Sequence, residues 1–339
     1  MFQFLKNEYD IINIKNIESI RNKTFFITGS NGLVGSNLVN YLYYVGLKRK
    51  LNLKIIAHSF SDAVFWIPKD KNIKFINSDL NSGIPDIKFD FMIHAATYGQ
   101  PKKVLENLSN CIDLNGHTYI KLLNQCKKNN AKILYLSSSE VYGCIPQSQL
   151  PCNEMYHGDV LTLSDRALYA ESKRIGEVIS HFYHKQHKNI KIARLAISYG
   201  PGARLNDQRF LNEIINKSID DKKIILWDDG SALRHVCFIT DIIEILLNIL
   251  LNGKELLYNV AGGVRNISIY DMARIVSQIQ KVPLEISCNQ NTIMGTPNIV
   301  ELDIDKYLKE FDKKNFIDLE YGIKKTIEWN YILRQKGVK

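Results

Sequence analysis

Short apolar runs alternate with amphipathic stretches along the first half of the chain. Each run is too short for a typical helix and is rich in Ile, Phe and Leu, which favours a strand. The predicted strands lie at 23–28, 54–58, 73–77, 91–94 and 132–137. Between several of them apolar residues recur at helical spacing, most clearly over 108–128. Strands alternating with helices predict an α/β fold, a Rossmann-like doubly wound parallel sheet with both faces covered.

The second half continues this alternation and then loosens. The predicted helices lie at 169–185, 209–218, 241–251 and 268–279, and the predicted strands at 191–196, 224–227 and 257–260. Ligands of doubly wound folds bind at the carboxyl ends of the strands, so we expect a smaller C-terminal lobe to close over that edge. We divide the chain into an N-terminal extension (1–22), a Rossmann domain (23–200, with 236–261 returning to it) and a substrate-binding lobe (201–235 and 262–339). The extension is expected to pack on the main domain through Ile11, Ile12, Ile14, Ile17 and Ile20.

Three glycines lie between the first predicted strand and the helix that follows it. Gly29, Gly32 and Gly35 have the spacing Gly-x-x-Gly-x-x-Gly. Glycine lets the chain turn tightly and approach a ligand, and the free N–H groups of a helix start attract an anion. The position of the loop between a strand and a helix therefore predicts the pyrophosphate-binding turn of a dinucleotide-binding βαβ unit.

Composition narrows the class of protein. Hydrophobic residues make up 45% and charged residues 23% of the 339 residues, as in an ordinary globular protein. The net charge is +9, but no basic run is interleaved with aromatic residues, so we expect no nucleic-acid partner. Six scattered cysteines without metal-ligand spacing indicate reduced thiols. The chain lacks a signal-peptide layout, and Glu244 and Asn248 interrupt its longest apolar stretch, so we expect a cytoplasmic protein without a membrane span.

Tyr169 and Lys173 lie four residues apart in a predicted helix and therefore share one face. A lysine ammonium beside a phenol favours the phenolate and lowers the tyrosine pKa. Such a tyrosine can take a proton from a hydroxyl while hydride leaves the same carbon. Ser137, Ser138 and Ser139 end the fifth predicted strand, where a ligand is expected, and a serine there can hydrogen-bond the reacting oxygen.

Together these motifs resemble the extended short-chain dehydrogenases/reductases, within the NAD-dependent nucleotide-sugar epimerases and dehydratases. The resemblance covers nearly the whole chain, from about Lys23 to the C-terminal helix. It rests on motifs that follow the family order: the glycine loop at 28–35, Asn77-Ser78-Asp79-Leu80, His94-Ala95-Ala96, Leu114-Asn115-Gly116, the serine cluster, Tyr169-x-x-x-Lys173 and Tyr199-Gly200-Pro201.

The resemblance also implies roles for individual residues. The catalytic residues it implies are Ser138, Ser139, Glu140, Tyr169 and Lys173. The cofactor-binding residues it implies are Gly29, Asn31, Gly32, Leu33, Val34, Gly35, His58, Ser59, Asp79, Leu80, Ala95, Ala96, Tyr98, Asn115, Tyr169 and Lys173. The substrate-binding residues it implies are Asn206, Arg209 and Arg234, of which Arg234 matches the arginine that grips the nucleotide diphosphate. Because the family often pairs through the helices at 108–128 and 169–185, a homodimer is expected.

The end of the second strand departs from the family pattern. His58 and Ser59 stand where an acidic residue normally holds the 2′-hydroxyl of NAD. No arginine near this position could bind the 2′-phosphate of NADP either. NAD is therefore the expected cofactor, and NADP stays open.

Three further departures concern the substrate. Ile197, Gly202 and Gly295 replace an asparagine and two arginines of the family. A substrate that carries a carboxylate would need a cation, so these replacements weigh against UDP-glucuronate decarboxylation. The stretches 159–166 and 201–209, and Ser139-Glu140, nevertheless resemble the UDP-glucuronate decarboxylases.

The expected reaction is oxidation of C4 of a nucleotide-activated hexose to a 4-keto sugar with bound NAD. Hydride return to the other face would give a 4-epimer, and loss of water with Glu140 as the base would give a 4,6-dehydratase. The alternatives are a UDP-glucuronate decarboxylase, an NADPH-dependent keto-sugar reductase and a non-catalytic binding protein on the same fold. No metal is expected, because His181, His184 and His187 have no carboxylate or cysteine partner in sequence.

Overall fold

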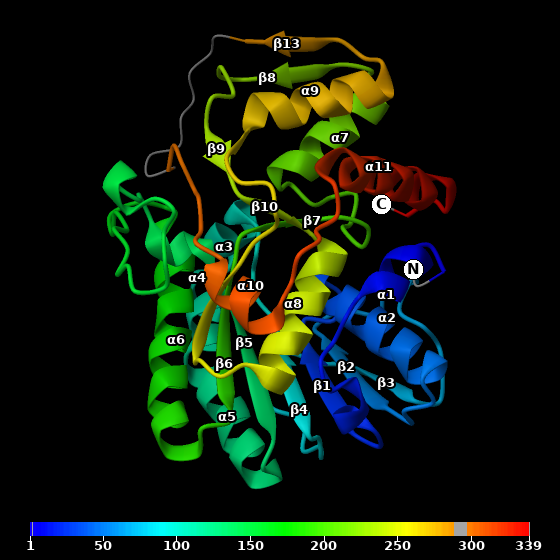
Figure 1. The fold of residues 1–339 in the computed structure, drawn as a ribbon, viewed down its shortest axis with the longest axis vertical. Helices are drawn as coiled ribbons and strands as arrows, with labels where there is room; N and C mark the ends of the chain where they lie inside the picture. Colours follow the sequence, from blue (N-terminus) through cyan, green and yellow to red (C-terminus); the bar gives the residue numbers. More distant parts are fainter. Residues whose placement is uncertain (2, 288–296, 339) are drawn as a thin grey trace.

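A seven-stranded parallel sheet forms the centre of the molecule (Figure 1). The computed structural model describes residues 1, 3–287 and 297–338. The strands run in the order β11-β6-β5-β4-β1-β2-β3, and every neighbouring pair is parallel. Their bounds are β1 Thr24–Thr28, β2 Lys54–Ser59, β3 Ile73–Asn77, β4 Phe91–His94, β5 Lys132–Ser138, β6 Ile190–Leu195 and β11 Leu257–Val260. The doubly wound sheet expected from the sequence is confirmed.

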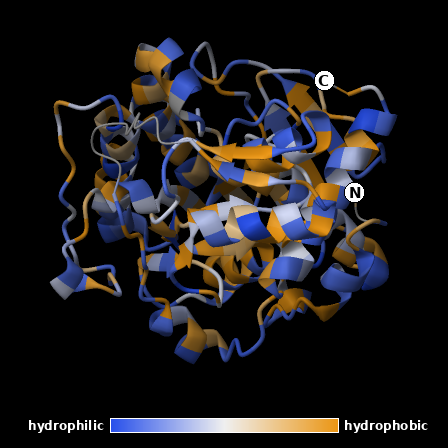
Figure 2. Ribbon diagram, turned by 90° about the horizontal axis from the view of Figure 1, so that it is seen from above, coloured by the Kyte–Doolittle hydropathy of each residue, from blue (hydrophilic) through white to orange (hydrophobic). Residues whose placement is uncertain are grey.

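Helices cover both faces of the sheet because alternate residues of each strand point to opposite sides. Phe25 and Ile27 of β1 share one buried cluster with α2 and α8. Phe26 points the other way and shares a second cluster with Tyr119 and Leu122 of α5. Figure 2 shows the hydrophobic strands enclosed between helices whose outer surfaces are largely hydrophilic. The main covering helices are α2 Leu33–Lys48, α4 Leu108–Asn115, α5 His117–Asn129, α6 Ala167–His187 and α8 Ile239–Asn252.

The single helix expected over 108–128 is wrong, because the structure has two. The helix α4 ends at Asn115 and α5 begins at His117. Gly116 between them has φ −109° and ψ −92°, which is not helical. Glycine adopts such a conformation at little cost, and an apolar periodicity that continues through the break conceals it in the sequence.

The smaller lobe stands above the sheet in Figure 1. Its helices are α7 Phe210–Asp220, α9 Ile269–Gln280 and α11 Leu319–Gln335. Its short strand pairs are β8 Ile224–Leu226 with β13 Leu284–Ile286, and β9 Leu233–Arg234 with β12 Ile267–Ser268. The remaining elements are α3 Pro101–Glu106, α10 Asp305–Phe311 and the pair β7 Ile197–Tyr199 with β10 Val236–Phe238. Ser268 caps α9 by accepting a hydrogen bond from the Asp271 amide, which confirms the predicted helix start.

The N-terminal segment packs between the two parts of the chain. It contains α1 Lys6–Ile11 and a 3₁₀ turn at Ile17–Ile20. Ile14, Ile17 and Ile20 are buried, but Ile11 is 68% exposed, so Ile11 does not belong to the expected packing face. Tyr9 donates a hydrogen bond to Asn37 of α2 (3.2 Å), and Tyr321 of α11 donates to Glu8.

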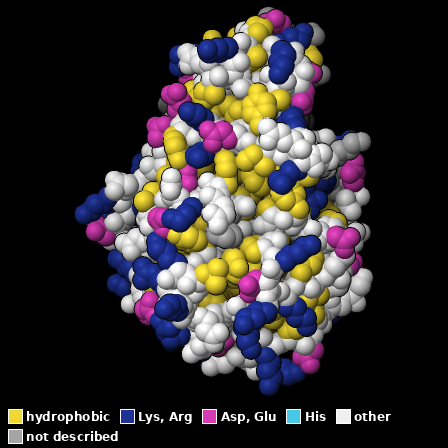
Figure 3. Space-filling model, turned by 90° about the vertical axis from the view of Figure 1, so that its right-hand side faces the viewer, with side chains coloured by type: hydrophobic (Ala, Val, Ile, Leu, Met, Phe, Trp, Pro, Cys, Tyr) yellow, Lys and Arg dark blue, Asp and Glu magenta, His cyan; other side chains and the backbone are white. Residues whose placement is uncertain are grey.

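Two observations concern the surface. On the face that carries both termini, Lys and Arg side chains lie in separate groups among acidic and apolar ones (Figure 3). No helix within the described part of the chain is both long enough and apolar enough to cross a membrane.

Candidate active site

The glycine loop connects β1 to α2 and leaves no room for a Cβ at Gly29 or Gly35. Gly29 has φ +68°, and a Cβ on it would lie 2.7 Å from the Ala95 backbone. A Cβ on Gly35 would lie 2.3 Å from the Gly29 carbonyl oxygen. Gly32, the N-cap of α2, offers no side chain to the first N–H groups of the helix. The loop therefore has the tight turn and the uncapped helix start that suit the pyrophosphate of a dinucleotide.

The buried Thr28 fixes the segment at 94–96 beside the glycine loop. Thr28 Oγ1 lies 2.8 Å from His94 Nδ1 and accepts a hydrogen bond from the Ala96 amide (3.2 Å). Burial lowers the pKa of His94 to about 3, so this imidazole is neutral. Ala95 and Ala96, expected to bind the cofactor, thus lie directly against the glycine loop. Leu33 and Val34 begin α2 beside it.

The adenosine end of the site has no carboxylate at the end of β2. His58 is buried there, and its Nε2 lies 3.0 Å from Ser78 Oγ. Burial lowers the pKa of His58, and its Nδ1 has no hydrogen-bond partner among the described residues. Ser59 is buried beside it at the end of the same strand. The chain therefore offers a neutral imidazole where the family pattern has an anion.

Three other residues expected at the cofactor have their own partners. Asn31 donates to the carbonyl oxygens of Ser61 and Asp62, so its amide holds the loop that follows β2. The Asp79 carboxylate accepts hydrogen bonds from the Asn81 amide and the Ser82 hydroxyl. Leu80 is buried three residues beyond the end of β3.

Ser138, Tyr169 and Lys173 come together at the carboxyl end of β5. Ser138 hydrogen-bonds Tyr169, and its Oγ also accepts from the Glu140 amide (3.2 Å). Lys173 is buried, donates to the Leu136 carbonyl oxygen (2.9 Å), and lies 5.1 Å from the centre of the Tyr135 ring. The structure thus brings together three residues expected to be catalytic.

The expected effect of Lys173 on Tyr169 is wrong for this structure. Burial, reinforced by the Glu140 charge, raises the pKa of Tyr169 to about 12, against the hydrogen bond from Ser138. Burial also lowers the pKa of Lys173 to about 8. The low polarity around both groups disfavours their charged forms.

Asn115, the last residue of α4, lies near the group formed by Ser138, Tyr169 and Lys173. It is fully buried at the end of α4, and its Oδ1 accepts a hydrogen bond from the Tyr135 hydroxyl (3.0 Å). Its Nδ2 donates to the Cys111 carbonyl oxygen (3.0 Å). Asn115 therefore fixes the tyrosine over which the Lys173 ammonium lies.

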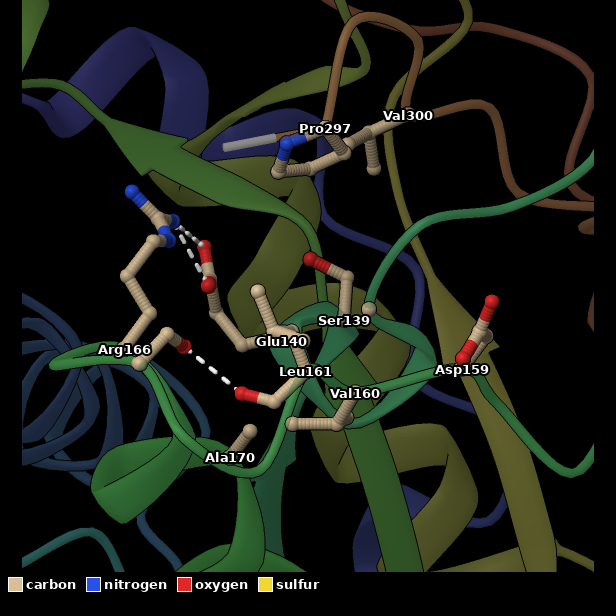
Figure 4. A pocket seen from close by; sticks show the side chains of 11 residues that line it. Ser139, Glu140, Asp159, Val160, Leu161, Arg166, Ala170, Pro297 and Val300 are labelled. Atoms are coloured by element: carbon tan, nitrogen blue, oxygen red, sulfur yellow. Dashed lines mark hydrogen bonds and ion pairs between the residues drawn. The ribbon is translucent and has the colours of Figure 1, made fainter. Parts of the chain in front are cut away.

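A small pocket opens beside Ser139 and Glu140, with Pro297 and Val300 of the smaller lobe on its far side (Figure 4). Arg166 Nη2 donates to both carboxylate oxygens of Glu140, each at 2.6 Å. Glu140 raises the pKa of Tyr169, so its charge acts on the tyrosine that the sequence predicts to be catalytic. Sequence reasoning missed Arg166, although it lies three residues before Tyr169 and hence on the same side of one helical turn.

Of the residues expected to bind substrate, Arg234 lies near enough to Arg166 and Glu140 for their charges to act on it. Arg234 is buried, donates to the Leu233 and Asn298 carbonyl oxygens, and has its pKa lowered by burial and by Arg166. Although burial disfavours its charge, Arg209 has a raised pKa because it is paired with Asp207. Asn206 is exposed in the loop before α7.

One departure from the family pattern, Gly202, has a local steric cause. Gly202 has φ +109°, and a Cβ on it would lie 2.6 Å from Asn37 Nδ2 and 3.1 Å from Met1 Cε. Asn37 of α2, together with Met1, thus fills the space that a longer side chain would need. Ile197 is half-buried at the start of β7. Gly295 lies outside the described residues.

The fold and the glycine loop define a short-chain dehydrogenase/reductase enzyme with a Rossmann sheet. The model of the NAD dependent epimerase/dehydratase family matches residues 25–261, more than half of the chain. The chain belongs to this family, and NAD is its cofactor. Its tight loop and uncapped helix start fit that cofactor.

Relatives agree with this assignment at low identity. UDP-glucuronic acid decarboxylase 6 of Arabidopsis thaliana is 27% identical over 286 residues, which cover 80% of this chain and 81% of the relative. UDP-glucuronic acid decarboxylase 1 of Xenopus tropicalis is 26% identical over 317 residues, covering 93% and 74%. The structure of UDP-N-acetylglucosamine 4-epimerase from Methanobrevibacter ruminantium has a TM-score of 0.80 at 20% identity, covering 92% of this chain and 99% of that one.

Proposed function

We propose that the protein oxidises C4 of a nucleotide-activated hexose to a 4-keto sugar and acts as an epimerase or dehydratase. The observation that carries this proposal is the grouping of Ser138, Tyr169 and Lys173 at the carboxyl end of β5. Ligands of such sheets bind at this edge. The family assignment and the nucleotide-sugar enzymes among the relatives and structural neighbours support the substrate class.

Each of the three side chains has its own role in this proposal. Tyr169 exchanges a proton with the hydroxyl that is oxidised, and Ser138 donates a hydrogen bond to the same oxygen. Lys173 binds the ribose next to the nicotinamide and supplies positive charge to the site. NAD, when bound, accepts and returns the hydride.

The fate of the 4-keto sugar depends on the pocket of Glu140. Oxidation at C4 makes the hydrogen of the neighbouring carbon acidic, and a carboxylate can remove it. Glu140 lines this pocket, and Figure 4 shows its carboxylate directed toward Arg166, which donates hydrogen bonds to it. We therefore favour a reaction in which a proton leaves the carbon next to C4, as in a dehydratase.

UDP-glucuronate decarboxylation is the second candidate, because two observations favour it. The named relatives are UDP-glucuronic acid decarboxylases. Arg166 also supplies a cation at the pocket, although the arginines that Gly202 and Gly295 replace are absent. The guanidinium uses one nitrogen for Glu140 and has further donors for a second carboxylate.

Mass spectrometry of the protein incubated with UDP-, dTDP-, CDP- and GDP-sugars tests the proposal. Loss of water or formation of an isomer is the expected result. Loss of carbon dioxide from UDP-glucuronate would establish the second candidate. No change in any sugar, with NAD bound to the protein, would contradict both.

We further propose a cytoplasmic homodimer. The helices α4 and α6 pack together and expose apolar side chains. These exposed side chains are Leu108, Ile112, Ile175, Val178 and Phe182. The cysteines in the described ranges are free thiols, as in a reducing compartment. Sedimentation of wild type and Val178→Glu tests the dimer, since a charge in a buried interface should separate the subunits; an unchanged mass would contradict this surface.

A further inference from the structure

We propose that Tyr135 is a positioning residue for Lys173, because its aromatic face holds the lysine ammonium charged and in place inside the buried site. The Lys173 Nζ lies 5.1 Å from the centre of the Tyr135 ring, within the range of a cation–π contact. The inference rests on the role proposed above for Lys173 as the cation of the site.

The buried ammonium of Lys173 has few polar partners. Its three N–H donors meet one acceptor among the described residues, the Leu136 carbonyl oxygen (2.9 Å). Glu177 lies on the same helix, but its carboxylate oxygens accept from Arg194 (2.8 and 2.6 Å). Burying a charge without enough partners is unfavourable, and the negative face of an aromatic ring offsets part of that penalty.

The titratable groups around Lys173 do not replace the ring. Burial lowers the pKa of Lys173 to about 8, although Cys111 of α4 and Glu177 act in the opposite direction. His94 of β4 is neutral, because burial lowers its pKa to about 3. Tyr169, one helical turn earlier, is neutral as well, since burial raises its pKa to about 12. The aromatic face therefore adds a stabilisation of the ammonium that these groups do not supply.

Three contacts fix the Tyr135 ring in this position. Its hydroxyl donates to Asn115 Oδ1 (3.0 Å), and its ring packs on Tyr119 with the centroids 4.7 Å apart. The helix α6 approaches so closely that a Cβ on Gly176 would lie 2.1 Å from the Tyr135 hydroxyl oxygen. Glycine is unfavourable inside a helix, and here it makes room for the ring against the turn that also carries Lys173.

The test titrates Lys173 by NMR in the full-length protein, labelled with ¹³C at the Cε atoms of its lysines. The signal of Lys173 is the one that Lys173→Met lacks. The comparison is between Tyr135→Phe and the same variant with a trifluorinated phenylalanine, which keeps the shape of the ring and weakens its negative face. The fluorinated ring should lower the pH at which Lys173 titrates by about one pH unit, as expected for the loss of a desolvated cation–π contact.

Tyr119→Phe, with and without the same fluorination, is the matched control. Tyr119 is buried in the same stack, and its hydroxyl bonds Ser180 (2.8 Å), so fluorination there should leave the titration of Lys173 unchanged. Two results would overturn the proposal: an unchanged titration when the ring at 135 is fluorinated, or an equal displacement when the ring at 119 is. The titration needs no sugar, so a lack of turnover would contradict the proposed function and leave this inference to be decided by the NMR result.

Discussion

The cofactor side and the substrate side of the cleft hold their functional residues by different forces. On the cofactor side, close backbone contacts determine which residues fit, since a Cβ on Gly35 would lie 2.3 Å from a carbonyl oxygen. On the substrate side, ion pairs hold the side chains in position: Arg166 pairs with Glu140, and Asp207 pairs with Arg209. Steric constraints select one residue type at one position, whereas an ion pair can be built in many ways. The cofactor side therefore follows the family pattern more closely than the substrate side does.

The largest effect is expected where the two sides meet. Tyr169→Phe removes the hydroxyl that we propose exchanges the substrate proton, and it should lower kcat by about 10²- to 10⁴-fold. Tyr183→Phe is the control, because the Tyr183 hydroxyl lies on the same helix and bonds Asn124 at the surface. Turnover is followed with the sugar found by mass spectrometry. Full activity of Tyr169→Phe would remove this residue from the chemistry.

The steric character of the cofactor side is tested by Gly35→Ala. The added carbon would meet the Gly29 backbone, so the loop must shift. We expect a loss of about 1–3 kcal/mol in the free energy of unfolding, the usual cost of overpacking, together with weaker NAD binding. Gly83→Ala is the control, because nothing lies within 4 Å of a Cβ built there. Denaturant melts and NAD titration measure both effects. Equal stability and equal NAD affinity of the two variants would show that steric contacts do not constrain the glycine loop.

Lys173→Met tests the cost of a buried charge between the two sides. Burial lowers the Lys173 pKa from 10.5 to about 8, so the unfolded chain binds more protons between these values. The penalty on folding is complete below about pH 8 and disappears as the pH rises toward 10.5. The methionine variant should be more stable below pH 8 by up to about 3 kcal/mol.

The pH dependence is the decisive part of this test. Melts of wild type and Lys173→Met should converge as the pH approaches 10.5, the ordinary value for lysine. Lys185→Met is the control, since it removes an exposed lysine from the same helix. A constant stability difference at every pH would show that packing, and not the charge of Lys173, separates the variants.

The sheet could be predicted from the sequence because its signals are local. The strands β1 to β4 lie within one residue of the expected ranges, and each is a short apolar run between polar turns. The glycine loop has an equally local cause, the lack of room for a Cβ at Gly29 and Gly35. The break at Gly116 was not predicted, because the residues on both sides keep the same apolar spacing.

The charge partners of the substrate side could not be predicted for a different reason. Glu140 and Arg166 are separated by 26 residues and meet through the loop between them. A sequence shows that both charges exist but not where the loop places them. The raised pKa of Tyr169 was missed for a related reason, since burial depends on all the elements that surround the side chain.

The smallest effect is expected for Arg166→Gln, which tests whether an ion pair organises the substrate side. Without the guanidinium, Glu140 loses its two charged hydrogen bonds and its fixed orientation. Hydrogen bonds between charged groups contribute about 1.5–3 kcal/mol, so we expect the proton transfer next to C4 to slow by about tenfold or more. The measurement compares deuterium uptake from D₂O at that carbon with hydride transfer to NAD. Hydride transfer should change little, and Arg166→Lys should recover part of the uptake.

Arg274→Gln is the control, because it removes an exposed pair with Asp271 on α9 and should leave both rates unchanged. Equal slowing of both steps by Arg166→Gln would mean that the pair supports the whole site and does not position Glu140.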